Sequence, residues 1–216
     1  MTLAAVLGLT VQAQSQSSSS QSSQSSQQDT SFITQAAQGN LAEVELGKLG
    51  AQKSQNQQIK QLSQHLQTDH QKANQQLQPI AQSKGLQLPQ QADAHHTRQL
   101  TQLQKLSGAE FDRQFATTAL QDHARTLALF QREAQQGQDP ATKQYAQSLV
   151  PALQHHLTMA QQAAKSVGVS DTTISSILSR YPGAVGGAGS PGGQQQGAGS
   201  SQSGYEGHQH MHDMQK

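Results

Sequence analysis

Four ionisable residues, each in the middle of an apolar stripe, are the residues of this sequence best suited to chemistry. They are Glu43, His70, His123 and His156. A stripe residue faces the core of a folded protein, where an unpaired charge or imidazole is costly. Four such side chains at similar depth could meet in one layer, and imidazole nitrogens with a carboxylate oxygen suit zinc, copper, iron or nickel. The sequence therefore predicts a buried polar or metal-binding centre.

The same four residues also fit a hydrogen-bonded core cluster without a metal, in which Glu43 accepts from one or more of the histidines. Di-iron carboxylate proteins carry Glu-x-x-His on two helices. Here Gln67 and Leu153 stand three residues before His70 and His156, so the partner carboxylates are absent. We therefore do not expect a standard di-iron site.

Several ionisable residues lie near the predicted layer but off the stripes. Asp69 and Asp122 each neighbour a stripe position, where a carboxylate either orients an imidazole or is a solvated surface charge. His65, His95 and His96 have no partner that the sequence reveals.

The C-terminal end carries a second pattern of metal ligands. His208, His210 and His212 stand at alternate positions beside two methionines. Such a segment can chelate copper or another divalent metal. Because it follows a Gly/Ser/Gln-rich stretch, we expect adventitious or scavenging binding there rather than catalysis.

The stripes that must position these residues predict four long helices. Apolar residues recur at helical spacing over residues 32–51, 57–84, 109–136 and 140–165. Start signals precede the segments, including Asn56, the Ser107-x-x-Glu110 capping box and the Asp139-Pro140 pair. Pro79 predicts a kink in the last turn of the second helix or an early end of that helix, and Pro151 predicts a local kink in the fourth.

The spacing of the segments predicts how the helices connect. The links between the first and second helices and between the third and fourth are short, whereas residues 85–107 form a long link. Leu100, Leu103 and Leu106 predict a short amphipathic helix within that link. No strand-like alternation occurs. We predict an all-α fold, a ferritin-like four-helix bundle with a long connection between helices two and three that carries a short helix.

The flanks differ in composition from the bundle segments. Residues 1–13 contain a short apolar run that ends at Val11-Gln12-Ala13 and predict a signal peptide without the usual basic start. Residues 14–28 are Ser/Gln-rich and predict a flexible linker. The bundle domain is predicted over 29–181, with a short C-terminal helix, and a disordered tail over 182–216.

Composition excludes several classes of protein. The chain has 216 residues, a net charge of +1 and only 3% aromatic residues, which argues against nucleic-acid binding. It has no Cys, so disulfides, thiolate metal sites, Cys nucleophiles and lipoprotein anchors are excluded. No segment is apolar enough for a transmembrane anchor. No nucleophile elbow, phosphate loop or His-Glu-x-x-His motif occurs, and nothing specifies a substrate or a protein partner.

Several motifs resemble the bacterial ferritin-like family called domain of unknown function 4142. They are Phe32-Ile33-x-x-Ala36-Ala37-x-Gly39-Asn40-x-Ala42-Glu43-Val44-Glu45-Leu46-Gly47-Lys48-Leu49, Asp69-His70, Phe111-Asp112, Asp122-His123 and Leu149-Val150-Pro151-x-Leu153-x-x-His156-Leu157. The resemblance covers roughly residues 30–165. It implies an exported protein of a group often labelled as outer membrane proteins, with no assigned activity.

We therefore expect a periplasmic or secreted helical bundle with a buried His/Glu centre that serves metal handling or envelope stress. A non-catalytic structural or interaction module is the alternative, in which the polar layer only sets helix register. A mononuclear metal enzyme is the third hypothesis, and the one that the sequence favours least.

Overall fold

The structure is a computed structural model that describes residues 13–185 of the chain. The predicted signal peptide, apart from its last residue, and the histidines of the tail, His208, His210 and His212, lie outside the described residues. The described residues form seven helices and no strand, which confirms the all-α prediction. The helices are α1 (Ala13–Lys53), α2 (Gln57–Ser83), α3 (Ala94–Lys105), α4 (Gly108–Gln136), α5 (Pro140–Ser166), α6 (Asp171–Leu178) and α7 (Pro182–Val185).

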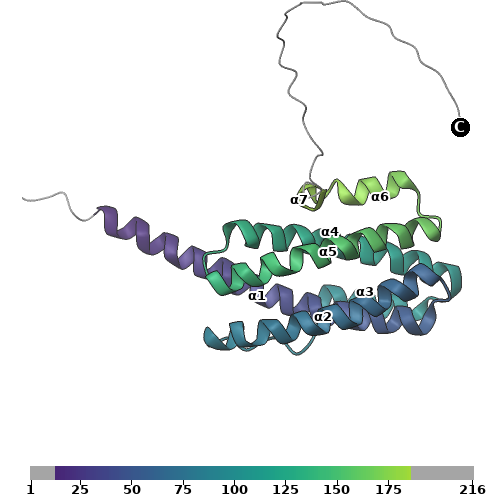
Figure 1. The fold of residues 1–216 in the computed structure, drawn as a ribbon, viewed down its shortest axis with the longest axis horizontal. Coiled ribbons are helices and arrows are strands. Elements are labelled where there is room, and N and C mark those ends of the chain that lie inside the picture. The colour runs from purple at the N-terminus through teal and green to yellow at the C-terminus, as the bar shows by residue number, and fades with distance from the viewer. Residues whose placement is uncertain (1–12, 186–216) are drawn as a thin grey trace, which may run out of the picture.

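Four of these helices form the bundle (Figure 1). The most extensive helix pairs are α1 with α2 and α4 with α5, and these two hairpins pack together through α2 against α5 and α1 against α4. The predicted long connection between the hairpins carries α3, which packs on α1 and α4. The predicted four-helix bundle with a helix in its long connection is therefore confirmed.

Contacts at one end of the bundle fix the direction of each helix. Asp29 of α1 accepts hydrogen bonds from the backbone N–H groups of Gln138 and Asp139 in the turn between α4 and α5. Lys84, at the end of α2, forms an ion pair with Asp139. Helices α1 and α5 therefore run one way, and α2 and α4 run the other. One long crossover between two hairpins gives this order.

The N-terminal signals behave partly as predicted. The Asn56 side chain accepts from two backbone N–H groups at the start of α2, and the Asp139 side chain accepts from the Thr142 N–H at the start of α5. Ser107 makes no side-chain hydrogen bond at the start of α4, so the predicted capping box does not form. Helix α2 continues past Pro79 and α5 past Pro151 without ending, because tertiary packing outweighs one missing hydrogen bond in each.

Two predicted boundaries differ from the structure. Helix α1 begins at Ala13, so the segment 14–28 that we predicted as a linker is helical. It has no Gly or Pro to end a helix, and glutamine is a good helix former, so the packed part of α1 propagates upstream through it. At the other end α7 runs to Val185, and Ala184 is buried, so the ordered part continues past residue 181.

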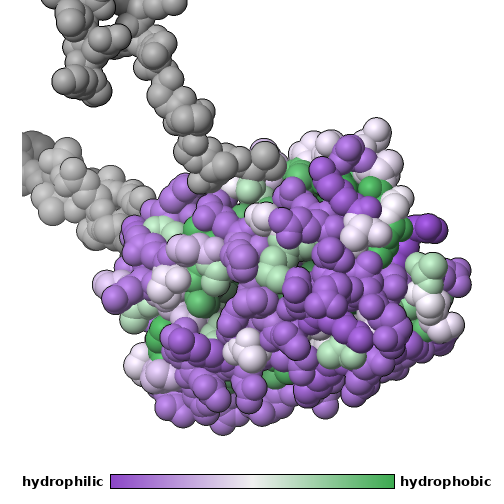
Figure 2. Space-filling model, turned by 45° about the vertical axis from the view of Figure 1, so that its right-hand side comes forward, coloured by the Kyte–Doolittle hydropathy of each residue, from purple (hydrophilic) through white to green (hydrophobic). Residues whose placement is uncertain are grey.

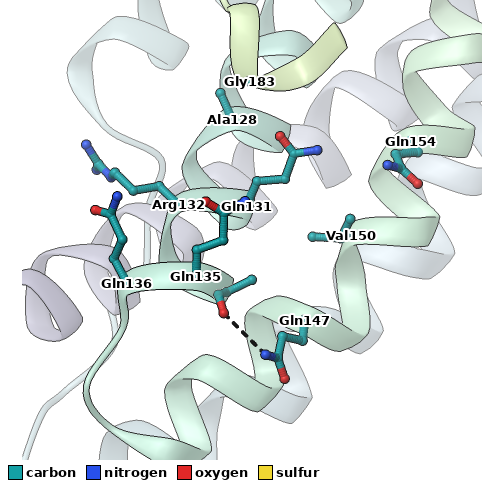
Figure 3. A pocket seen from close by; sticks show the side chains of 10 residues that line it. Ala128, Gln131, Arg132, Gln135, Gln136, Gln147, Val150, Gln154 and Gly183 are labelled. Carbon is teal, nitrogen blue, oxygen red and sulfur yellow. Dashed lines mark hydrogen bonds between the residues drawn. The ribbon is translucent and has the colours of Figure 1, made fainter. Parts of the chain in front are cut away.

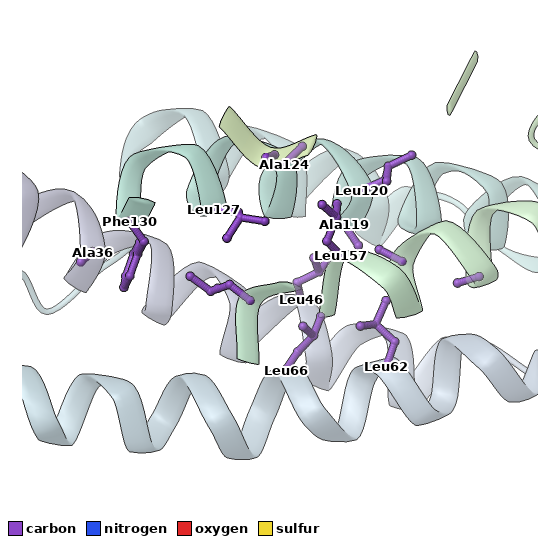
Figure 4. Close-up of a cluster of buried hydrophobic side chains, with 14 of the residues drawn as sticks. Ala36, Leu46, Leu62, Leu66, Ala119, Leu120, Ala124, Leu127, Phe130 and Leu157 are labelled. Carbon is purple, nitrogen blue, oxygen red and sulfur yellow. The ribbon is translucent and has the colours of Figure 1, made fainter. Parts of the chain in front are cut away.

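Aromatic residues occupy both ends of the core. Phe32 packs edge-on against Phe130 and Tyr145, with ring centroids 4.9 and 6.2 Å apart. Phe111 and Phe115 form the other cluster, near the start of α4. Between them lie aliphatic side chains from all four bundle helices, several of which are drawn in Figure 4. The middle of the bundle, where the predicted polar layer lies, is therefore closed at both ends by apolar side chains.

Helices α1 and α2 approach closely where α1 carries glycine. A methyl group on Gly47 would lie 2.7 Å from the carbonyl oxygen of Ser63, and one on Gly50 would clash with Phe115. Gly39 faces open space, although its place on the stripe suggested close packing there as well. The close approach holds α1 and α2 together beside the polar layer.

The outer surface is predominantly hydrophilic. Figure 2 shows one face, on which hydrophobic residues are scattered among polar ones. No helix among residues 13–185 is long and apolar enough to cross a membrane.

Candidate metal centre

Three of the four predicted residues converge in the middle of the bundle. His70 of α2, His123 of α4 and His156 of α5 are 4%, 0% and 1% exposed. Their ring centroids lie 5.3 to 5.6 Å apart. One nitrogen of each ring lies within 4.8 Å of a nitrogen of each of the others. The predicted convergence is therefore confirmed for these three residues, which we call the histidine triad.

Each imidazole of the triad has one nitrogen held by an oxygen atom that can only accept. The pairs are His70 Nδ1 with Asn40 Oδ1 at 3.0 Å, His123 Nδ1 with the Ala119 carbonyl at 2.9 Å and His156 Nε2 with Asp69 Oδ2 at 2.9 Å. In each pair the imidazole N–H must donate, and this assigns the tautomer. The hydrogen bond also fixes the orientation of each ring, as it does for histidines that bind metals.

The remaining nitrogen of each ring carries a lone pair and has no partner. These atoms are His70 Nε2, His123 Nε2 and His156 Nδ1, all of them buried and unpaired among the described residues. Buried polar atoms are nearly always hydrogen-bonded, so three such atoms in one layer need a physical reason. A cation among them would supply it.

The spacing of the triad is close to that of a metal site. Three atoms no more than 4.8 Å apart share a point that lies within about 2.8 Å of each of them. Zinc–imidazole distances are about 2.0–2.1 Å, so the rings need to close by at most about 0.7 Å. The rings of the triad are therefore at most slightly farther apart than in a zinc site.

Burial keeps the triad in the form that binds metals. Desolvation lowers the pKa of His70 well below 6.5, and the neighbouring His123 and His156 add to the effect. The pKa of His123 is lowered to about 3 by burial and by His156. Burial also lowers the pKa of His156, although its hydrogen bond to Asp69 opposes the shift. All three rings are therefore neutral at neutral pH, with lone pairs available to a cation.

Glu43 lies beside the triad rather than within it. Its Oε1 is 3.6 Å from Nδ1 of His123, the nitrogen that donates to Ala119. Its Oε2 is buried and has no partner among the described residues. Burial and then the nearby Asp122 carboxylate raise the pKa of Glu43 well above 4.5. The structure therefore places a buried carboxyl group, whose surroundings favour its protonated form, behind His123.

Asp69 and Asp122 have different surroundings. Asp69 accepts a hydrogen bond from His156 and so orients that ring, which was one of the two interpretations from the sequence. Even so, 42% of the Asp69 side chain is exposed. Asp122 orients no histidine of the triad. It is buried, and its nearest charged partner is Arg125, whose Nη2 lies 3.7 Å away.

Two histidines that lacked an evident partner in the sequence have one in the structure. His65 Nδ1 lies 3.5 Å from Asp69. His96 donates from Nδ1 to Asp93 and accepts at Nε2 from Arg125, at 2.8 and 2.6 Å. Asp69 and Asp93 lie one helical turn from their histidines, and Arg125 lies on another helix. Considering each histidine alone therefore did not identify these partners.

Asn40 is the site residue that sequence reasoning missed. It is 4% exposed, accepts from His70 and donates from Nδ2 to the Tyr145 hydroxyl at 3.2 Å. A hydrogen-bonded chain thus runs from the triad to the aromatic cluster. The available signal was its position one turn before Glu43, where a polar residue faces the same side of α1.

Two small cavities flank the polar layer. A cavity of about 10 Å³ is lined in part by Asn40, Asp69, His70 and His156. Another of about 10 Å³ lies between α1, α3 and α4, where Glu43, His96 and Asp122 face it. Each has room for about one water molecule.

A larger hollow of the described surface lies elsewhere. It has a volume of about 600 Å³ and lies between α4, α5 and α7. Figure 3 shows that polar side chains line it, among them Gln131, Arg132, Gln135, Gln147 and Gln154. None of the triad residues reaches it, so its size alone does not make it the functional site.

Comparison with known proteins adds the family. The profile of the family described as "Domain of unknown function (DUF4142)" matches residues 14–163, more than half of the chain. The chain belongs to the DUF4142 family. The three histidines of the triad, Asn40 and Asp69 all lie within the DUF4142 domain. No curated protein and no solved structure matches the chain. The predicted family membership is confirmed, and the family description assigns no activity.

Proposed function

We propose that the DUF4142 domain of this protein binds one divalent transition-metal ion through His70, His123 and His156. One observation carries the proposal: each ring has one nitrogen fixed by an oxygen acceptor and the other buried without a partner. The fixed nitrogens have the role of the outer hydrogen bonds that orient metal-binding histidines. The free nitrogens are the ligands.

The donor set points to a borderline metal such as zinc, copper, iron or nickel. Neutral imidazoles suit these ions, whereas calcium and magnesium prefer oxygen ligands. Three protein ligands leave a fourth position open to water or another small ligand. We propose metal handling or envelope stress as the biological role, and we do not assign a reaction.

We also propose that the protein works outside the cytoplasm, in the periplasm or as a secreted protein. The apolar run at residues 3–11, followed by the small residue Ala13, supports export. The absence of cysteine is compatible with an oxidising compartment.

A structural module is the second candidate, because the polar layer links helices without any ion. The His70–Asn40 bond joins α2 to α1, and the His156–Asp69 bond joins α5 to α2. Directional bonds of this kind set the register between helices. In this case the three unpaired nitrogens have no function of their own and accompany the hydrogen bonds that set the register.

Metal analysis of the full chain decides between the two candidates. The tail histidines are first replaced, as His208→Ala, His210→Ala and His212→Ala, because truncation near residue 181 would remove the buried Ala184. The protein is purified without metal resin and titrated with zinc. We expect one equivalent of zinc and a rise in melting temperature through linkage.

Variants then locate the ion. His70→Ala with His156→Ala should remove both the zinc and the thermal shift, whereas His95→Ala, an exposed histidine on α3, should change neither. His123→Gln is the second test, because it keeps a polar side chain of similar length in the layer. If the tail-substituted protein binds no zinc and its melting temperature does not change, the metal proposal is refuted and the structural module stands.

A further inference from the structure

A second group of metal-ligand side chains lies where the triad meets the surface. It consists of His65 and Asp69 on α2 and His156 on α5. His65 Nδ1 lies 3.5 Å from Asp69 Oδ2, and His156 Nε2 lies 2.9 Å from the same oxygen. One ligand atom from each residue falls within 4.8 Å of the others. His156 therefore belongs to two groups, one buried and one open to solvent.

The two groups that share His156 lie in different environments, one open to solvent and the other buried. The side chains of His65 and Asp69 are 46% and 42% exposed, whereas that of His156 is 2% exposed. His65 and Asp69 lie one helical turn apart, so both project from the same face of α2. His156 thus stands between an open pair of ligands and the closed middle of the bundle.

An ordinary surface ion pair does not account for this arrangement. An exposed histidine and aspartate one turn apart contribute little to stability. Here a second imidazole, from another helix, reaches the same carboxylate oxygen. A third imidazole, that of His155, packs edge-on against His65 with centroids 5.5 Å apart. Imidazole nitrogens and a carboxylate oxygen at this spacing suit the same ions as the triad does.

We propose that His65, Asp69 and His156 form an outer site that captures a divalent transition-metal ion and passes it to the histidine triad. The transfer rests on the proposed function, since it needs the buried site as its destination. The outer site itself rests only on the three residues and their exposure.

The chemistry of a neutral imidazole makes the transfer stepwise. The ring of His156 has one N–H and one lone pair, so only one of its nitrogens can hold an ion. In the outer site the ion binds Nε2, and the proton lies on Nδ1. When the ion moves inward to Nδ1, the Nδ1 proton is released to solvent. Nε2, now free of the ion, takes up one proton from the solvent beside the exposed Asp69 and again donates to that carboxylate. The two sites are therefore occupied one at a time, and one ion binds at equilibrium.

The rate of metal uptake tests the proposal. Cobalt(II) is mixed with the metal-free, tail-substituted full chain, and the visible absorption of the bound ion is followed in time. We expect His65→Ala to remove one of the three ligands that capture the ion and to slow uptake on the order of tenfold, the low end of what one residue at a metal site contributes. The one equivalent bound at equilibrium should not change. His95→Ala is the matched control, because it removes an exposed imidazole from α3 and should leave the rate unchanged.

A variant that lacks one triad ligand tests the outer site directly. His123→Gln removes a ligand of the triad but none of the outer site, so this variant should still bind cobalt, although more weakly. Adding His65→Ala to it should remove that binding. Cobalt that remains bound after both changes would overturn the outer site.

The outcomes separate this inference from the proposed function. If His65→Ala takes up cobalt at the parental rate, the outer site is refuted and the buried site is unaffected. If His65→Ala abolishes all binding while His123→Gln binds like the parent, the ion occupies only the outer site and the proposed function fails. A parent that binds no cobalt refutes both.

Discussion

Acid should destabilise the metal-free protein through the buried histidines, and His123 gives the clearest case. Burial lowers its pKa to about 3 in the folded state, whereas a histidine in the unfolded chain titrates near 6.5. Between these pH values the unfolded state binds a proton that the folded state does not. The stability from this residue is therefore complete above pH 6.5 and is lost as the pH falls towards 3.

The size of the loss follows from the unfolded-state pKa alone. Each pH unit below 6.5 costs about 1.4 kcal/mol until the folded-state pKa is reached. Between pH 7.5 and 5.0 the loss from His123 is therefore about 2 kcal/mol. The result does not depend on the folded-state pKa as long as this stays below 5. His70 and His156, whose pKa values are also lowered, add losses of the same sign.

Urea denaturation in the presence of a chelator measures this loss. The free energy of unfolding is compared at pH 7.5 and 5.0 for the wild type, His123→Leu and the control His95→Leu. The wild type and the control should each lose about 2 kcal/mol more than His123→Leu over this range. The other titrating groups are common to the wild type and His123→Leu and cancel in that comparison, and the control differs from the wild type only at the exposed His95. Equal losses in the wild type and His123→Leu would refute the assignment of a neutral, buried imidazole.

Other predictions concern the glycines of α1 and the buried Glu133 of α4. Gly47→Ala should lower the free energy of unfolding by about 1–3 kcal/mol, because the new methyl group meets the Ser63 carbonyl. Gly39→Ala should raise it by about 0.5–1 kcal/mol, because this position faces open space. Thermal melts of both variants measure the two effects. Burial and then a hydrogen bond with Asp29 raise the pKa of Glu133 to about 7, so stability present below pH 4.5 is lost as the pH rises towards 7. Between pH 5 and 8 the wild type should lose on the order of 1–2 kcal/mol of unfolding free energy through Glu133, a value already reduced for solvent screening. Glu133→Gln should not show this loss. Glu110→Gln, at an exposed position, should lose as much stability as the wild type does.

The fold could be predicted from the sequence because its signals are local and repeated. Apolar residues at helical spacing located the four bundle helices, and Asn56 and Asp139 marked two of their starts as the structure has them. The upstream part of α1 was missed for the opposite reason. A Ser/Gln segment buries little apolar surface and suggests a linker, but nothing in it ends a helix that packing has already nucleated.

The site could be predicted only in part. Stripe position and depth brought His70, His123 and His156 together correctly, because α2, α4 and α5 cross the layer near their midpoints. The same reasoning could not tell which edge of His123 faces Glu43, since that depends on the rotation of each helix and on side-chain rotamers. It also missed Asn40, whose role appears only when α1 lies against α2.

The triad takes its ligands from both halves of the fold. His70 belongs to the α1–α2 hairpin, and His123 and His156 belong to the α4–α5 hairpin. The two hairpins are joined in the chain only by the crossover that contains α3. An ion held by the triad would therefore close a loop of about 50 residues and cross-link the hairpins, which restricts the unfolded chain. In a protein without cysteine, the ion would take the place of a disulfide, and it could be withdrawn by a chelator.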